Sequence, residues 1–337
     1  MRHVRNPPNP YLKYSAEYIG EPPGAKIEVF EETATKKIIT ENNSPDVGFK
    51  FSVNCYRGCI HACTYCFARP YHEFLGFGAG TDFETKIVAK INAPELLRKE
   101  LKSARRKIDS LNFSFTTDPY LPVEADYELT RKCLQICHDF KIPVGIVTKS
   151  PLVTRDVDVL SKMNSTVYFS IPFLTTEKSK PFEPFVPVPD ARFRAMRVLA
   201  DAGIEVGIAL APVIPSYNEP DIPALLEKAR ENGATRAFMT ILRLPTESLR
   251  EYFIERLHER IPTKAERILN QIKRERGGRL NSNEFGARMS GKTENWQIAV
   301  KLFDLHFKRL GYKKFETVER PEENTTENPQ PIQQNLF

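Results

Sequence analysis

The sequence predicts an α/β fold, a partial (β/α)6 barrel of the TIM type with a metal-cluster loop after its first strand and a helical C-terminal extension. Six short apolar segments alternate with six amphipathic segments between residues 48 and 260. Apolar strands separated by amphipathic helices are typical of a parallel sheet covered by helices. A cysteine-rich loop follows the first strand directly. It would therefore lie at the carboxyl end of the strands, where barrels of this kind carry their chemistry.

Each element is indicated by its own local signals. The first helix has Pro94 in its first turn, where proline is favoured, and Gly203 and Gly233 end two later helices, as glycine commonly does. Beyond residue 260, a basic segment and an amphipathic segment predict two more helices, at 263–278 and 294–310. The six strands are expected at 48–53, 111–116, 143–148, 166–171, 204–211 and 236–242, and their helices at 93–108, 126–140, 155–163, 190–202, 221–232 and 247–260.

We therefore expect four regions along the 337 residues. Residues 1–45 are rich in proline and polar residues and predict an extended lead-in, and 46–260 would form the barrel. Residues 261–316 would form the helical extension. Residues 317–337 are polar and rich in proline, which predicts a disordered tail.

Composition excludes several classes of protein. No apolar run reaches the roughly 18 residues of a membrane helix, and the basic N-terminus is not followed by the apolar core of a signal peptide. Six cysteines are too few for a disulfide scaffold, and four of them lie within residues 55–66, which favours a metal site in a reducing compartment, the cytoplasm. The net charge of +6 permits a nucleic-acid partner without requiring one.

The cysteine loop predicts an iron–sulfur cluster with one open iron. Cys59, Cys63 and Cys66 have C-x3-C-x2-C spacing, and three soft thiolates can hold three corners of a 4Fe–4S cubane. The fourth iron could then bind the amino and carboxylate groups of S-adenosylmethionine (SAM), and reductive cleavage would give a 5′-deoxyadenosyl radical that abstracts hydrogen. Tyr65 lies where an aromatic ring could pack beside adenine. This is the signature of radical SAM enzymes, which also need an electron donor such as flavodoxin or ferredoxin.

The other cysteines leave alternatives open. Cys55 could complete a four-thiolate zinc site near His61, although zinc sites usually use two separated C-x2-C pairs. It could instead be a free thiol at the end of the first strand. Cys133 and Cys137 lie four residues apart on one expected helix, which favours a buried apolar face over a second metal site or a hydrogen-atom donor.

The chain resembles the radical SAM group related to spore photoproduct lyase, often labelled DNA repair photolyase, and within it a poorly characterised bacterial subgroup. The resemblance runs from about residue 20 to 311. It rests on the cluster loop 56–70 and on six further blocks, namely 82–86 (DFETK), 117–124 (TDPYLPVE), 148–151 (TKSP), 211–215 (APVIP), 242–245 (LRLP) and 285–289 (FGARM).

The resemblance implies roles for individual residues. Cys59, Cys63 and Cys66 would be cluster ligands. Thr117, Lys149 and Ser170, at the ends of the second, third and fourth strands, would contact SAM. Asp118 would bind a ribose hydroxyl or cap the turn before Pro119.

Two departures limit what the resemblance implies. The subgroup tends to have proline where this chain has Cys55, and Glu-Pro-Arg where this chain has Glu183-Pro184-Phe185. The additional cysteine and tyrosine with which spore photoproduct lyase completes dimer repair have no clear counterpart. Repair of thymine dimers therefore does not transfer to this chain.

The substrate has three competing interpretations. Basic stretches at 98–107 and 264–276 favour nucleic acid, for repair or modification by a lyase-like or modifying enzyme. The final residues 333–337 (QQNLF) resemble the short peptide that docks on the bacterial replication sliding clamp. A peptide or small-molecule substrate is the second interpretation, although no cysteine-rich C-terminal extension for auxiliary clusters is present. The third is a non-catalytic four-cysteine protein that binds nucleic acid, which would not cleave SAM.

Overall fold

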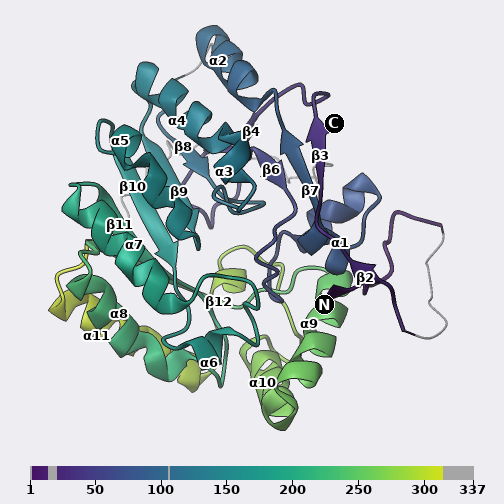
Figure 1. Ribbon diagram of the computed structural model, residues 1–337. Coiled ribbons are helices and arrows are strands. Elements are labelled where there is room, and N and C mark those ends of the chain that lie inside the picture. The colour runs from purple at the N-terminus through teal and green to yellow at the C-terminus, as the bar shows by residue number, and fades with distance from the viewer. Residues whose placement is uncertain (1, 14–20, 105–106, 314–337) are drawn as a thin grey trace, which may run out of the picture.

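A computed structural model describes residues 2–13, 21–104 and 107–313 (Figure 1). The predicted tail and its clamp-like peptide at 333–337 lie outside the described residues. The strands are β1 (Arg2–His3), β2 (Gly24–Ala25), β3 (Glu28–Glu32), β4 (Ile39–Glu41), β5 (Phe51–Val53), β6 (Tyr56–Arg57), β7 (Lys86–Lys90), β8 (Leu111–Phe113), β9 (Val144–Thr148), β10 (Ser165–Ser170), β11 (Glu205–Val213) and β12 (Arg236–Ile241).

Helices alternate with these strands over most of the chain. The α-helices are α1 (Thr81–Thr85), α2 (Ala93–Ser103), α3 (Glu124–Tyr127), α4 (Leu129–Asp139), α5 (Val157–Leu160), α6 (Thr176–Ser179), α7 (Pro189–Asp201), α8 (Ile222–Glu231), α9 (Glu247–Arg260), α10 (Pro262–Glu275) and α11 (Glu294–Arg309). Short 3-10 helices are η1 (Arg69–Leu75), η2 (Pro151–Asp156), η3 (Glu219–Asp221) and η4 (Ala287–Met289).

The main sheet has seven strands in the order β12-β11-β10-β9-β8-β5-β4. From β5 to β12 every neighbouring pair is parallel, and only β4 runs antiparallel to β5 at the edge. Six parallel strands in sequence order, connected by helices, are the arrangement predicted for a partial (β/α)6 barrel. The fold class is confirmed.

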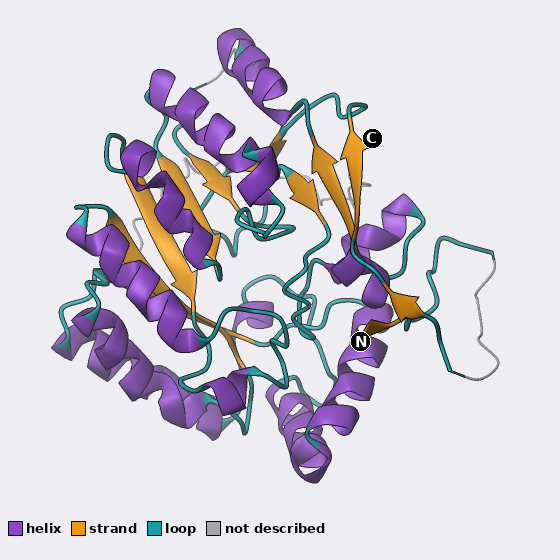
Figure 2. Ribbon diagram, viewed as in Figure 1, coloured by secondary structure: helices purple, strands orange, loops and turns teal. Residues whose placement is uncertain are grey.

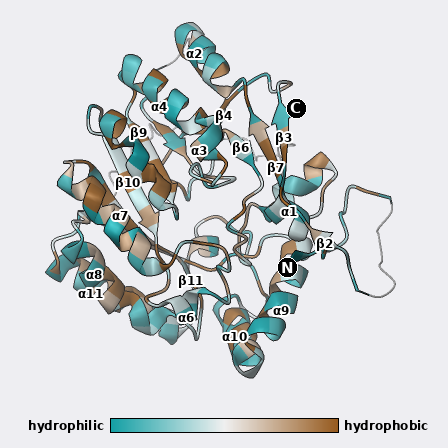
Figure 3. Ribbon diagram, in the orientation of Figure 1, coloured by the Kyte–Doolittle hydropathy of each residue, from teal (hydrophilic) through white to brown (hydrophobic). Residues whose placement is uncertain are grey.

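The helices α2, α4, α5, α7 and α8 lie on one side of this sheet (Figure 2). Their apolar sides face the strands, and Figure 3 shows hydrophobic and hydrophilic sides on several of them. The largest buried cluster fills this space, with fully buried residues such as Leu134, Ile146 and Met196.

The helical extension packs beyond the barrel. Helix α11 contacts α8, and the Tyr312 hydroxyl donates to the carbonyl of Leu226 at 2.6 Å. Helices α9 and α10 pack on each other, and their buried leucine and isoleucine side chains join a second apolar cluster that includes Cys63 and Tyr65. The extension therefore supports the cysteine loop from outside the barrel.

Three predicted helices are shorter than expected. The helix expected at 93–108 ends at Ser103, because Ala104 has an extended backbone. The helix expected at 126–140 begins at Leu129, because Glu128 has a φ of 53° and breaks the chain into α3 and α4. The helix expected at 155–163 is reduced to α5, since residues Pro151–Asp156 form a 3-10 helix instead. In each place a local backbone break overrides an otherwise helical pattern of apolar residues.

A second sheet was not predicted. It has three strands in the order β3-β7-β6, with β3 parallel to β7 and β6 antiparallel to it. Strand β3 is the polar run Glu28–Glu32, and its partner begins at Lys86, so the pairing is not local. Among the described residues, every helix is too short or too polar to span a bilayer.

Candidate active site at the carboxyl edge of the sheet

The cysteine loop occupies residues 58–68, between β6 and η1. Its backbone is folded tightly on itself: the Ala62 amide donates to the Cys59 carbonyl at 3.1 Å, and the Cys66 amide donates to the Cys63 carbonyl at 3.3 Å. The Cys59 amide donates to the Phe83 carbonyl at 2.8 Å. These bonds hold the three cysteines on one compact turn.

Arg69 holds this loop from beneath and is fully buried. Its Nε donates to the Cys63 carbonyl at 2.9 Å, and its Nη1 donates to the carbonyls of Ala79 and Gly80. Its Nη2 forms an ion pair with Glu84 at 2.6 Å. Arg69 was not expected to have a role, since nothing in a single arginine after a motif indicates four partners across the chain.

The donor set fits an iron–sulfur cluster. Burial raises the pKa of all three thiols, to about 12 for Cys59. Buried thiols of this kind ionise when a metal supplies the compensating charge, and thiolate is the preferred ligand of iron–sulfur clusters. In the described part of the chain, no three His, Cys, Asp or Glu side chains converge as the ligands of a single ion would. A cubane does not require this, since each thiolate binds a different iron.

A polar network joins three of the predicted SAM contacts. Lys149, at the end of β9, donates from Nζ to the Ser170 hydroxyl at 2.5 Å, at the end of β10. The same ammonium lies 3.0 Å from Glu183 Oε1, and it stands 5.8 Å from the centre of the Tyr65 ring. The Tyr65 hydroxyl donates to the same Glu183 oxygen. Lys149 and Tyr65 thus meet at one carboxylate, and Ser170 is joined to it through the Lys149 ammonium.

Glu183 is the fully buried centre of this network, a role that was not predicted from the sequence. Arg192 on α7 pairs with its Oε2 at 2.6 Å, and Ser179 donates to the same oxygen at 3.0 Å. Burial by itself would raise the pKa of Glu183, but the charges of Arg192 and Lys149 lower it to about 2. The carboxylate is therefore ionised and fully hydrogen-bonded. Glu183 lies in a loop, and Arg192 lies nine residues later on a helix, so no periodic signal connects them.

Asp118 organises a second network beside the first. Its Oδ1 accepts from the Thr148 hydroxyl at 2.7 Å and from the Tyr120 amide at 2.9 Å, and its Oδ2 accepts from the Lys149 amide at 2.7 Å. The His61 ring lies 3.4 Å from Oδ2, and burial lowers the pKa of His61. These contacts are those expected of a turn cap, one of the two predicted roles.

Thr117 contacts the cysteine loop rather than the Lys149 network. Its hydroxyl donates to the Gly58 carbonyl at 2.5 Å, directly before Cys59. Strand β8 ends at Phe113, earlier than the expected 116, so Thr117 and Asp118 lie in the loop after it. Every predicted site residue therefore lies on the cysteine loop, at a strand end or in the loop after one.

The remaining cysteines lie in the core. The Cys55 sulfur lies 3.7 Å from the Cys133 sulfur, and Cys55, Cys133 and Cys137 are all buried. Cys133 and Cys137 lie on the side of α4 that faces the apolar core, as expected for a buried helix face. Cys55 contacts this pair, so its thiol points into the core between β5 and α4.

Comparison with known proteins places the chain in a family. Residues 53–229 match the radical SAM superfamily, a range that begins just before the cysteine loop and ends in α8. An uncharacterized protein of Mycobacterium tuberculosis H37Rv is 33% identical over 214 residues, covering 62% of this chain and 62% of that protein. An uncharacterized protein of Methanocaldococcus jannaschii is 34% identical over 192 residues, covering 57% of this chain and 70% of that protein.

Solved structures of spore photoproduct lyase share the fold. The lyase complexed with dinucleoside spore photoproduct has a TM-score of 0.60 at 18% identity, covering 85% of this chain and 81% of that chain. A variant with bound AdoMet and dinucleoside spore photoproduct has a TM-score of 0.58 at 17% identity, covering 85% and 80%. At this level of identity the likeness is one of architecture.

Proposed function

Because this chain belongs to the radical SAM superfamily, whose cofactors are a 4Fe–4S cluster and SAM, we propose that it is a radical SAM enzyme acting on nucleic acid. The observation that carries the proposal is the position of Cys59, Cys63 and Cys66. They lie on one buried loop at the carboxyl edge of six parallel strands, beside the network of Lys149 and Glu183.

The roles of individual residues follow from their chemistry. The three cysteines would hold the cluster, and when bound the cluster and SAM together supply a 5′-deoxyadenosyl radical for hydrogen abstraction. Lys149 and Ser170 would bind polar groups of SAM, because their ammonium and hydroxyl lie at adjacent strand ends. Tyr65, held in orientation by Glu183, would pack beside the adenine. Asp118 would hold the strand ends around the bound cofactor.

A nucleic-acid substrate is supported by aromatic side chains near the cysteine loop. Phe67, which follows Cys66, is 44% exposed, and Phe74 and Phe285 are 47% and 60% exposed. Exposed aromatic rings interleaved with arginines are typical of surfaces on which unpaired bases stack. Arg288 supplies such a cation, since its guanidinium lies 4.4 Å from the centre of the Phe285 ring.

Arg243 adds an unsatisfied cation at the same edge. It follows β12, its Nε is buried without a partner among the described residues, and Nη1 contacts only the Met289 sulfur at 3.7 Å. Burial lowers the pKa of Arg243, and the charge of Arg288 lowers it further. A phosphate oxygen beside Arg243 would relieve this penalty, whereas Arg288 is already paired with Asp46.

Anaerobic reconstitution with iron and sulfide tests the reaction type. We expect a 4Fe–4S electron paramagnetic resonance signal in the dithionite-reduced protein that changes on adding SAM, together with formation of 5′-deoxyadenosine. The C63S variant should lose both, and the matched control C137S, a buried cysteine on α4, should keep both. A signal that is indifferent to SAM, or zinc in place of iron, would contradict the proposal.

The substrate class is tested with the same preparation. We expect single-stranded or ultraviolet-damaged DNA, or RNA, to accelerate formation of 5′-deoxyadenosine. Stimulation by peptides or small metabolites alone would favour the alternative substrate class. Two partners remain proposals on sequence grounds: an electron donor such as flavodoxin or ferredoxin, and a sliding clamp that would bind residues 333–337. A pull-down with and without those five residues tests the latter.

A further inference from the structure

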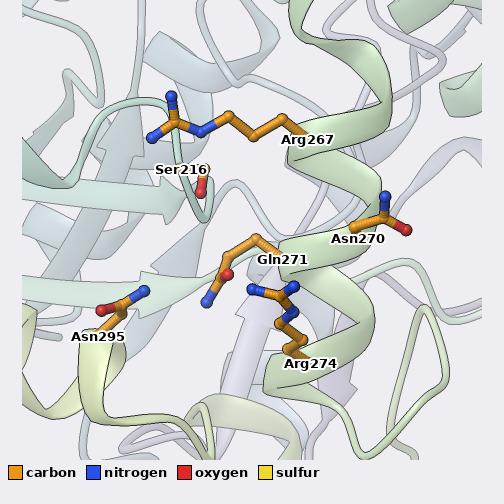
Figure 4. A pocket seen from close by; sticks show the side chains of 6 residues that line it. All are labelled: Ser216, Arg267, Asn270, Gln271, Arg274 and Asn295. Carbon is orange, nitrogen blue, oxygen red and sulfur yellow. The ribbon is translucent and has the colours of Figure 1, made fainter.

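A polar trough lies between helix α10 and the start of helix α11 (Figure 4). Its larger part is a cavity of about 320 Å³ lined by Ser216, Arg267, Asn270, Gln271, Arg274 and Asn295. A second cavity of about 240 Å³ adjoins it and shares Gln271, Arg274 and Asn295. Because the two cavities share one wall, they form a single elongated trough, a shape that suits a chain-like ligand.

Two arginines provide the charge of the trough. Arg267 and Arg274 are seven residues apart on α10, so they lie on the same face of the helix about 10 Å apart. Figure 4 shows both guanidinium groups extending to the side of α10 where Ser216 and Asn295 lie. Neither side chain has a hydrogen bond or an ion pair within the described part of the chain. Their positive charges are therefore free to bind an anion.

Beneath the trough lies a buried acid, Glu275, whose carboxylate already accepts hydrogen bonds from its neighbours. Glu275 is 2% exposed and accepts from the Thr293 amide at 3.0 Å, from the Thr293 hydroxyl and from Gln271 Nε2 at 2.9 Å. These bonds tie α10 to the N-cap of α11. One acid, Glu294, lines the smaller cavity, so the larger cavity carries the stronger positive charge.

The trough lies on the same edge of the molecule as the candidate active site. Ser216 follows the carboxyl end of β11, whose residue Ala211 accepts a hydrogen bond from the Ser170 hydroxyl at 3.2 Å. Lys264, one turn before Arg267, lies 5.8 Å from the centre of the Tyr217 ring and extends the basic face of α10. A strand held in the trough would thus run toward the rim that carries Lys149 and Ser170.

We propose that the α10–α11 trough binds the phosphate backbone of a single strand of nucleic acid and positions that strand at the active-site rim. Arginine, serine, asparagine and glutamine are the side chains that contact backbone phosphates without reading sequence. The binding is therefore independent of base sequence. This inference rests on the proposed action on nucleic acid, but it is tested by binding alone.

The test is the salt dependence of binding. The cluster-reconstituted full-length protein and its R267Q/R274Q variant are titrated against a fluorescein-labelled single-stranded oligonucleotide at several salt concentrations. Loss of two phosphate contacts should reduce the slope of log K against log salt by about 1.4, which is about a 25-fold weaker affinity at 0.1 M salt. The matched control K301Q/K308Q removes two exposed lysines from α11 outside the trough and should keep the wild-type slope.

Two results of this titration would overturn the inference. Equal affinity and slope for wild type and R267Q/R274Q would overturn the inference. If the variant loses binding of a free mononucleotide but retains the oligonucleotide, the trough binds a small phosphorylated molecule instead, which also overturns it. Circular dichroism melting confirms that the variant is folded. Formation of 5′-deoxyadenosine in the same samples reports separately on the proposed reaction, so the two proposals can fail independently.

Discussion

Removing Arg192 should reveal how much the buried carboxylate of Glu183 depends on its counter-ion. Arg192 is fully buried and makes three hydrogen bonds, to the carbonyls of Pro187 and Ser170 at 2.7 and 2.8 Å and to Glu183 at 2.6 Å. Deleting one partner of a buried ion pair costs about 3 to 5 kcal/mol. Since Lys149 still faces Glu183, we expect R192M to lose about 3 kcal/mol of unfolding free energy at pH 7.5.

The lowered pKa of Glu183 gives a similar magnitude for all the charges and hydrogen bonds around this carboxylate together. In the wild type, a folded-state pKa of about 2 for Glu183, against 4.5 for an unperturbed glutamate, corresponds to about 3 kcal/mol. Because this pKa is lowered by folding, the stabilisation is present above about pH 4.5 and is lost as the pH falls toward 2. In R192M the main lowering charge is gone, so burial raises the pKa of Glu183. The difference in unfolding free energy between the wild type and R192M should therefore be smaller at pH 5 than at pH 7.5.

Urea denaturation followed by circular dichroism measures these free energies. The control is K228M, which breaks the exposed pair of Lys228 with Asp190 at 2.6 Å and should cost less than about 1 kcal/mol. A double-mutant cycle with E183Q isolates the pair, and we expect a coupling of about 2 kcal/mol or more. The dependence of Glu183 on Arg192 is disproved if R192M loses less than 1 kcal/mol, or if its loss is the same in the E183Q background.

Three further predictions concern the site and its support. C55A should keep the iron content and SAM cleavage of the wild type, because Cys55 contacts Cys133 in the core; loss of iron would favour the four-thiolate alternative. K149M should weaken SAM binding about 10- to 100-fold in equilibrium dialysis with unchanged iron content, as expected for loss of a charged hydrogen bond, and an unchanged Kd would exclude a SAM contact. Burial lowers the pKa of His72 to about 4, so this ring stabilises the fold above pH 6.5 and loses that contribution as the pH falls toward 4. H72F should show a flatter decline in unfolding free energy from pH 7 to 5 than the wild type, and parallel declines would contradict this.

The fold class was predictable because its signals are local. Each parallel strand is a short apolar run, and each following helix has an apolar face of its own, so alternation along the chain was sufficient to predict the order of the sheet. The second sheet was not predictable, because Glu28–Glu32 has little strand character and gains its partner only at Lys86. Helix boundaries failed where single residues such as Glu128 adopt a left-handed backbone.

The cluster ligands of the candidate site could be predicted from the sequence, but the prediction of the residues around them was incomplete. The spacing of Cys59, Cys63 and Cys66 determines the cluster motif, since three thiolates within eight residues are brought together by the loop itself. The strand ends that carry Lys149 and Ser170 followed from the barrel geometry. Glu183 and Arg192 did not, because a loop carboxylate and a helix arginine look like ordinary surface residues until burial makes their charges depend on each other.

The order of the strands, the cysteine motif and the family resemblance could be predicted from the chain alone, because all of them depend on neighbours close in sequence. The folded chain was needed to show which charges are buried together, where Cys55 points, and that Arg267 and Arg274 face a trough without partners among the described residues. Burial and pairing depend on contacts between segments that are distant in the chain. The free energy of a charge depends on those contacts, and residue type alone does not specify them.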